Sequence, residues 1–377
     1  MQTSYRFSAP GRTEISGNHT DHQHGCVLAA AVDLETTAEV TLRPDSIIRV
    51  ASEGYAPVEI DLNDLSVHAE EKNTTAALVR GVAAAFAQRG CKLHGFDAAV
   101  RSTVLPGSGL SSSAAFEVLI GTICNELFFD KNAPPSRSRR SASMPRTSIS
   151  ASPAASWIRW PPVSAGWSSS ILPTRRTPPS GRRRSILRIA ATSLCTLDSG
   201  ADHADLTDEY AAIPEEMRRV ARVFGKDVLR EVDEAEFYAK LKAAREAAGD
   251  RAVLRAMHFF DENRRVQQQV QALERDDFEG FLAGVRDSGR SSWMLLQNVV
   301  PAGSREHQQM ALALAACEKQ LAGRGACRIH GGGFAGTLLA FVPNEALASF
   351  RANMEAVLGE GRCHVLSIRQ AGGVRLA

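Results

Sequence analysis

A polar stretch near the start of the chain, PGRTEISGNHTDHQHG at residues 10–25, gathers hydrogen-bonding side chains between glycines. Together these side chains offer donors and acceptors in several directions, which recognition of a polyol requires. Taken alone, the stretch is equally compatible with a polar turn. The residues that would do this chemistry are Arg12, Asn18, His19, Asp21 and His22.

A second stretch, LPGSGLSSSAAFEVLIG at residues 105–121, combines glycines with three consecutive serines. Gly107 and Gly109 allow backbone amides to approach an anion closely. Ser111–Ser113 then open an apolar segment that predicts a helix, whose N-terminus offers unpaired N–H groups and a positive dipole end to a phosphate. Helix capping alone needs only one serine. The stretch therefore favours a phosphate site, with hydroxyls that can also reach Mg²⁺.

A third stretch, RIHGGGFAGTLLAF at residues 328–341, has four glycines in six positions around Phe334. Such a run indicates that the backbone must approach another group closely. A tight turn between two elements is the simpler alternative.

The elements that would position these stretches are mixed. Alternating or β-branched runs bounded by turn formers predict strands at residues 35–44, 47–54, 96–105, 193–200, 337–343 and 363–369. Amphipathic or apolar runs predict helices at residues 74–90, 111–128, 215–224, 234–248, 253–274 and 346–359. The chain of 377 residues is long enough for two lobes around one cleft. We therefore predict an α+β protein whose second lobe is the more helical.

Composition narrows the class of protein. The N-terminus lacks the apolar core of a signal peptide, and no apolar run reaches the length of a membrane span. The seven cysteines form no CxxC pair, which favours reduced thiols in a cytoplasmic protein. The net charge is +2, but 11 arginines lie within residues 136–188, and the remaining chain carries 33 basic against 42 acidic residues. A general nucleic-acid surface is therefore not expected, nor is a membrane partner.

The three stretches, in this order and separation, resemble the GHMP kinases. The first narrows the resemblance to the galactokinases, which carry an arginine and a Gly-Glu-His-Thr-Asp-Tyr-like run near the N-terminus. This implies a two-lobed fold, with a ribosomal-protein-S5-domain-2-like N-terminal lobe over residues 1–190 and a ferredoxin-like helical C-terminal lobe over 191–377. It implies a small-molecule enzyme that takes a sugar and ATP, with Mg²⁺, and we expect a monomer.

The resemblance also implies roles for individual residues. Arg12 matches the arginine that stabilises the transferring phosphoryl group. Ser113 stands at the magnesium-ligand position, and the Gly331–Gly336 turn would shape the cleft beneath the phosphates. The sugar-binding positions are Asn18, His19, Thr20, Asp21 and Tyr210. The ATP phosphate loop corresponds to Gly107, Ser108, Gly109, Leu110, Ser111, Ser112 and Ser113.

The implied reaction is transfer of the ATP γ-phosphate to the anomeric hydroxyl of galactose. Phosphoryl transfer needs positioning, Mg²⁺ and positive charge more than covalent help. Two departures leave the sugar open, because Asn18 replaces the usual Glu and His22 the usual Tyr. N-acetylgalactosamine and arabinose kinases are therefore alternatives. His258, Glu262 and Asn263 are interpreted as part of a helix face in the C-terminal lobe, and Asp202 and His203 as the approach to Tyr210.

One segment does not fit this family. Residues 136–188 contain 14 Ser, 11 Arg and 7 Pro, with no Lys, Asp or Glu. Galactokinases carry a run like AENxYFGxPCGLMDQ in this region, which supplies the Asp that acts as catalytic base and a Glu that holds Mg²⁺. The chain as written lacks both carboxylates, so we predict little or no kinase activity and poor folding around this segment.

The genetic code suggests a cause. Joining the third base of each codon to the first two of the next forces Asp at the Trp157–Ile158 junction and Ala at Trp160–Pro161 and Met144–Pro145. With permitted codons elsewhere, residues 144–163 read AENVYFGKPCGLMDQMASS, which places the missing Glu at Pro145–Arg146. We therefore hypothesise compensating frameshifts that open near Ser136 and close between Leu187 and Ser193.

Two alternatives remain. The segment could be a genuine basic, disordered insertion whose serines are open to phosphorylation. The protein could also be a catalytically silent galactokinase relative that senses sugar and ATP, since it keeps Arg12, Asp21 and the serines but not the base.

Overall fold

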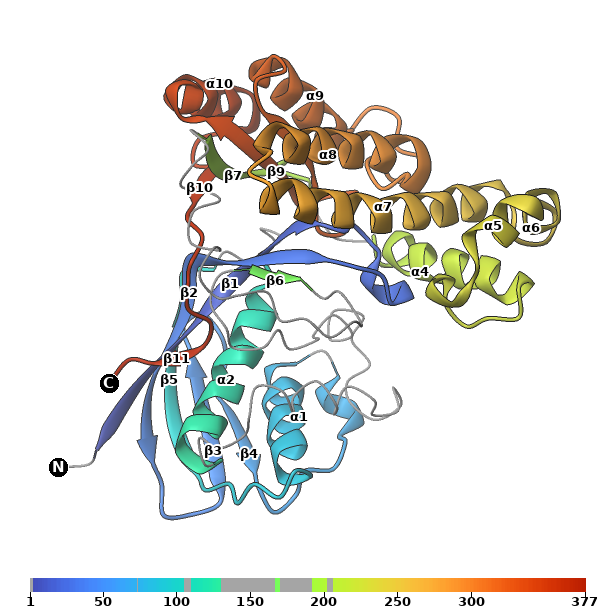
Figure 1. Cartoon of the computed structure of the whole chain (residues 1–377). Helices are drawn as coiled ribbons and strands as arrows, with labels where there is room; N and C mark the ends of the chain where they lie inside the picture. Colours follow the sequence, from blue (N-terminus) through green and yellow to red (C-terminus); the bar gives the residue numbers. More distant parts are fainter. Residues whose placement is uncertain (1–2, 73, 105–109, 130–166, 170–191, 202–205) are drawn as a thin grey trace.

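The structure is a computed structural model, and it describes residues 3–72, 74–104, 110–129, 167–169, 192–201 and 206–377. Within these residues the fold is α+β, with two sheets and two groups of helices (Figure 1). Only residues 167–169 of the anomalous segment are described, so most of the frame hypothesis falls outside the described residues.

The first sheet is built from strands of the N-terminal half, and a strand from the end of the chain pairs with β1 at one edge. Its order is β11-β1-β2-β5-β3-β4, and β6 also pairs with β2. All its pairings are antiparallel except β3 with β5. The strands are β1 (Ser4–Ser16), β2 (Leu28–Leu42), β3 (Ile47–Ser52), β4 (Val58–Asp61), β5 (Phe96–Ser102), β6 (Trp167–Ser169) and β11 (Val374–Arg375).

Strand β1 extends further than the sequence pattern indicates. It includes Pro10–Ser16, which we interpreted as part of a polar loop, and it pairs with β2 with register shifts between Pro10 and Arg12 and between Glu14 and Ser16. Such irregularities bend a strand and re-aim its side chains. The register shifts accommodate Pro10 and Gly11 within the strand. Because of them, apolar and polar residues do not alternate regularly here, and the sequence pattern does not indicate a strand.

The second sheet is antiparallel, in the order β10-β7-β9-β8. Its strands are β7 (Thr192–Asp198), β8 (Ala326–His330), β9 (Thr337–Pro343) and β10 (Cys363–Leu366). Strand β9 is buried along its whole length. Leu339 and Phe341 pack in one hydrophobic cluster, while Leu338 and Ala340 pack in another, so the sheet is covered on both faces.

Helices cover both sheets (Figure 1). In the N-terminal half α1 (Thr75–Ala87) and α2 (Ser112–Phe128) pack together, and α2 lies against β1 and β2. In the second half α8 contacts β8 from one side, while α9 and α10 contribute to the other hydrophobic cluster. The remaining helices are α4 (Thr207–Val223), α5 (Glu234–Ala239), α6 (Leu241–Ala248), α7 (Asp250–Glu274), α8 (Phe278–Ser291), α9 (Gln309–Leu321) and α10 (Leu347–Leu358).

The helix predicted over residues 234–248 is broken. Lys240 has φ −106° and ψ 23°, which ends α5 and begins α6. The break lets Phe237 and Ala244 enter the same hydrophobic cluster against α4 and α7. Tertiary packing therefore outweighs the local preference of residues 234–248 for one continuous helix.

Two sequence-based interpretations can be compared with the described residues. All seven cysteines are buried free thiols, as expected. None of the helices in the described ranges is both long and apolar enough to cross a bilayer. A division at residue 190 stays a prediction, because β11 returns to the first sheet and one hydrophobic cluster takes residues from both halves.

Candidate active site

Strand β1 carries the first candidate residue to the start of α2. The Arg12 guanidinium donates a hydrogen bond to Ser111 Oγ over 3.0 Å, and the Arg12 backbone N–H donates to the Leu110 carbonyl over 3.1 Å. The first two polar stretches therefore meet. Ser111 itself has φ 57°, a left-handed conformation, at the N-cap of α2.

Beyond β1 the chain forms a compact turn, which we call the first polar loop (residues 17–26). Three of its residues have left-handed backbones: Gly17 at φ 101°, His19 at 55° and His24 at 61°. A Cβ at Gly17 would lie 2.5 Å from the Cys26 carbonyl oxygen, so only glycine lets the loop close on itself. The Thr20 hydroxyl lies 2.6 Å from the same oxygen and completes the closure.

Asp21 presents a carboxylate with an open acceptor. Its Oδ1 atom is buried and has no hydrogen-bond partner. Burial, together with the charge of Glu14, raises the pKa of Asp21 to about 7. A sugar hydroxyl donating to Oδ1 would satisfy this atom and favour the ionised form.

Asn18 and His19 connect the loop to the third polar stretch. Asn18 Nδ2 donates to the Gly331 carbonyl over 2.7 Å, and His19 Nε2 lies 3.0 Å from the Gly332 carbonyl, to which it donates. Burial lowers the pKa of His19 to about 4, so its ring is neutral near pH 7. Glycine carbonyls thus orient both side chains.

Tyr210 lies against the same glycine turn. Its hydroxyl donates to the Gly333 carbonyl over 2.9 Å, and its ring meets Phe334 edge-on with centroids 5.6 Å apart. A Cβ at Gly332 would lie 2.6 Å from the Tyr210 ring. The close approach predicted from the run of glycines is therefore an approach to this tyrosine at Gly332, and to the Asn298 backbone at Gly333, where a Cβ would overlap the Asn298 carbonyl oxygen. Burial raises the pKa of Tyr210 to about 12.

Two residues of this region were missed by the sequence analysis. Glu14 is buried, and its carboxylate accepts from Arg328 over 3.0 Å and from Asn18 Nδ2 over 3.3 Å. Asn298 is fully buried and donates to Asn18 Oδ1 over 3.1 Å. Glu14 stands in the first stretch and could have been found there, whereas nothing around Asn298 distinguishes it in the sequence.

The phosphate end of the site is described only in part. Leu110 and Ser111–Ser113 are placed, and the Ser113 side chain is exposed, while Gly107, Ser108 and Gly109 lie outside the described residues. The positions that should supply the base and the magnesium Glu, Trp157/Ile158 and Pro145/Arg146, also lie outside them. The described residues hold no group of three or more His, Cys, Asp or Glu that could bind a metal ion.

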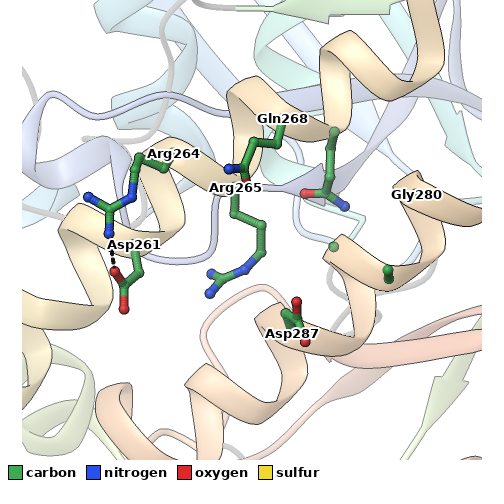
Figure 2. A pocket seen from close by; sticks show the side chains of 9 residues that line it. Asp261, Arg264, Arg265, Gln268, Gly280 and Asp287 are labelled. Atoms are coloured by element: carbon green, nitrogen blue, oxygen red, sulfur yellow. Dashed lines mark hydrogen bonds and ion pairs between the residues drawn. The ribbon is translucent and has the colours of Figure 1, made fainter. Parts of the chain in front are cut away.

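A pocket of about 350 Å³ lies elsewhere, between α7 and α8 (Figure 2). Arg265 from α7 and Asp287 from α8 approach it from opposite sides. Its charged lining residues form ion pairs, Arg264 with Glu234 and Asp261, Arg265 with Glu262, and Asp287 with Arg290. None of the residues predicted for sugar or nucleotide binding lines this pocket.

Comparisons with known proteins agree with these motifs. The galactokinase galactose-binding signature matches residues 2–42, and the GHMP kinases N terminal domain matches residues 77–144. A galactokinase of Streptomyces coelicolor is 30% identical over 350 residues, covering 89% of this chain and 84% of that protein. One of Glaesserella parasuis is 28% identical over 367 residues, covering 91% and 86%.

Solved structures show the same fold. The crystal structure of Lactococcus lactis galactokinase complexed with galactose has a TM-score of 0.72 at 21% identity, over 99% of this chain and 94% of that one. A crystal structure of mevalonate kinase has a TM-score of 0.60 at 10% identity, over 97% and 99%. The likeness to both confirms the two-lobed kinase fold.

Proposed function

The chain belongs to the galactokinase family of the GHMP kinases, and from that premise we propose that it binds galactose and ATP for phosphorylation of the anomeric hydroxyl. Membership makes it a sugar kinase, a phosphotransferase that acts on an alcohol group with ATP as donor. Galactose as the acceptor and Mg²⁺ as the metal are parts of the proposal.

One observation carries this proposal. The Arg12–Ser111 hydrogen bond joins the strand that leads into the first polar loop to the helix start expected to hold phosphates. Within the same strand and loop, Asp21 keeps a buried oxygen without a partner. Strand β1 therefore connects a candidate receptor for a polyol hydroxyl with the helix start that would hold a phosphate, and transfer between the two requires such proximity.

We also propose that the chain as written has lost its catalytic activity. The segment 136–188 contains no carboxylate, so the chain as written has no residue there that could accept the hydroxyl proton or bind Mg²⁺. Galactose binding should persist because its candidate residues lie in other segments. Turnover should be close to background.

A coupled ATP-consumption assay with galactose, run beside calorimetric titrations, tests both parts. We expect galactose to bind the purified chain without appreciable turnover, and a chain translated in the shifted frame over residues 136–190 to turn over. Ordinary turnover by the chain as written would contradict the impairment. Absence of galactose binding by both chains would contradict galactose as the substrate.

The same titrations distinguish the alternative substrates. N-acetylgalactosamine or arabinose binding more tightly than galactose would reassign the acceptor. The nucleotide sequence across codons 130–195 tests the frame hypothesis directly, since one uninterrupted frame with no GLMDQ in its neighbour would refute it.

A catalytically silent sensor is the second candidate. Two observations support it: hydrogen bonds orient Asn18 and His19 of the first polar loop, and segment 136–188 lacks carboxylates. Tight binding of both ligands, with no turnover after the frame is restored, would support the sensor over the kinase.

A further inference from the structure

The underside of the first polar loop rests on three buried polar side chains of helix α7. His258, Glu262 and Asn263 are at most 7% exposed, and His258 and Glu262 are four residues apart, so these two share one helix face. All three contact the backbone of the loop, across sequence separations of 237 to 244 residues. Nothing in the helical pattern of this segment indicates where its polar face would dock.

Glu262 holds the loop where it leaves β1. One carboxylate oxygen accepts the backbone N–H groups of Gly17 and Asn18, each over 3.2 Å. It also accepts from Ser288 Oγ on α8 over 2.8 Å, while the other oxygen pairs with Arg265. Burial alone would raise the pKa of Glu262, but the charges around it, Arg265 first, hold that pKa below its usual value. The carboxylate is therefore ionised.

His258 and Asn263 hold further points of the same loop. His258 Nε2 donates to the Asn18 carbonyl over 2.9 Å, which leaves Nδ1 to accept from Ser291 Oγ over 2.8 Å. Asn263 Oδ1 accepts the Cys26 backbone N–H over 2.7 Å at the other end. The two ends of the loop are thus fixed to one rigid helix.

These contacts restrain a backbone that is otherwise strained. Gly17 and His19, on either side of Asn18, have left-handed conformations. An unrestrained loop would adopt this pair of conformations only for part of the time. A cluster needed only to fill the interior could be apolar, since buried charges add little net stability over packed apolar groups. A carboxylate that accepts two adjacent backbone N–H groups instead fixes the orientation of the peptide backbone at Gly17 and Asn18.

We propose that Glu262, supported by His258 and Asn263, is a positioning residue that sets the geometry of the sugar-binding loop. It acts through the backbone at Gly17 and Asn18 and does not touch the sugar. The inference rests on the proposed role of this loop in binding galactose.

A matched pair of substitutions tests the proposal on the full-length chain. Glu262→Gln keeps an oxygen that can accept the two N–H groups, whereas Glu262→Met has a similar shape and no comparable acceptor. We measure amide hydrogen exchange without ligand, and the affinities for galactose and for ATP by calorimetry. Asp261→Asn, one residue away and paired with Arg264 at the surface, is the control.

We expect Glu262→Met to speed exchange of the Gly17 and Asn18 amides and to weaken galactose binding about ten-fold or more, because two buried N–H groups lose their acceptor. ATP affinity should stay within about two-fold, since Glu262 makes its hydrogen bonds to Gly17, Asn18, Arg265 and Ser288 and to none of the described phosphate residues, Leu110–Ser113. Glu262→Gln should restore most of the galactose affinity, and Asp261→Asn should change neither ligand.

Three results would overturn the proposal: unchanged exchange at residues 17 and 18 in Glu262→Met, equal weakening of galactose and ATP, or no difference between the Met and Gln variants. If neither the parent chain nor the chain translated in the shifted frame binds galactose, the proposed function fails. The exchange measurement then still decides whether Glu262 positions the loop.

Discussion

The charge of Asp21 should make the stability of the protein depend on pH. Its folded pKa of about 7 is raised above the value of 3.8 expected for an exposed group. The folded state therefore binds the proton more tightly, and the stabilisation present below pH 4 is lost as the pH rises through 7. We expect Asp21→Asn to remove this loss, which is on the order of a few kcal/mol at about 1.4 kcal/mol per pKa unit.

Urea unfolding at pH 5 and pH 8 measures the effect. The parent chain should lose free energy of unfolding between these values relative to Asp21→Asn. Parallel pH profiles for the two proteins would refute the raised pKa. Galactose should bind more weakly below pH 7, because protonation of Asp21 removes the negative charge that strengthens hydrogen bonds from the sugar hydroxyls.

Gly332 should tolerate no side chain while Tyr210 stays in place. The alanine Cβ would lie 2.6 Å from the Tyr210 ring, so the ring or the turn must move. We expect Gly332→Ala to destabilise the protein by about 1–3 kcal/mol, as overpacking does, and to weaken galactose binding.

A double-mutant cycle isolates the contact at Gly332. In a Tyr210→Ala background the ring is absent, so Gly332→Ala should have much less effect on the free energy of unfolding. An equal effect in both backgrounds would place the strain in the turn itself.

Individual site residues could be predicted where the motif is local. Arg12, His19 and Asp21 stand in one short stretch, and their residue types suit a polyol. Asn298 could not be predicted, because its role comes from contacts with Gly332 and with Asn18, and the contact with Asn18 forms only when the two halves pack. The sequence assigns Glu262 only to a helix face. Its contact with the backbone of the first polar loop is visible only in the tertiary structure.

At the scale of elements, a buried ion pair joins α4 to α7. Glu216 accepts from Arg255 over 2.8 Å, and Arg255 is fully buried and also donates to the Leu296 carbonyl. We expect Glu216→Ala to lower the free energy of unfolding by about 3–5 kcal/mol, because it leaves a buried guanidinium without its counter-charge.

Glu215→Ala is the matched control, one position away on α4. Glu215 pairs with Arg218 and Arg222 at the surface, where ion pairs contribute about 0–1 kcal/mol. Comparable losses in the two variants by urea unfolding would show that helix propensity, rather than the ion pair, stabilises α4.

Elements could be predicted where one pattern dominates. Strand β9 is a short continuous apolar run and was predicted with its observed bounds, and α2 was predicted to within one residue. Strand β1 was not, because Pro10, Gly11 and two register shifts obscure its alternation. The break at Lys240 depends on packing against α4 and α7, which a helical pattern does not contain.

At the scale of the whole molecule, the end of the chain returns to the first sheet beside β1 (Figure 1). The Leu376 N–H donates to the Arg6 carbonyl over 2.7 Å, the Arg6 N–H donates to the Ala377 carbonyl over 3.0 Å, and Arg375 lies over the Tyr5 ring. We expect deletion of residues 372–377 to lower the free energy of unfolding by about 1–3 kcal/mol through these lost bonds and to promote aggregation at the freed edge of β1.

Arg375→Ala separates the side chain from the strand. It keeps the backbone pairing and should remove only the contact with Tyr5, about 0.5–1 kcal/mol. Light scattering and thermal unfolding compare the two proteins. An equally soluble deletion variant would show that β1 does not need its neighbour.

The two-lobed organisation could be predicted from motif order, since the three polar stretches resemble one family. The pairing of β11 with β1 could not, because two residues near the end of the chain carry no signal for a partner some 370 positions earlier. The pairing register of such distant strands depends on contacts that exist only in the folded sheet.

That closing strand also bears on biosynthesis. A ribosome makes β1 some 366 residues before β11, so one edge of the first sheet stays uncovered while the residues between them are synthesised. During that time the exposed edge of β1 can pair with another chain unless chaperones cover it or folding is fast.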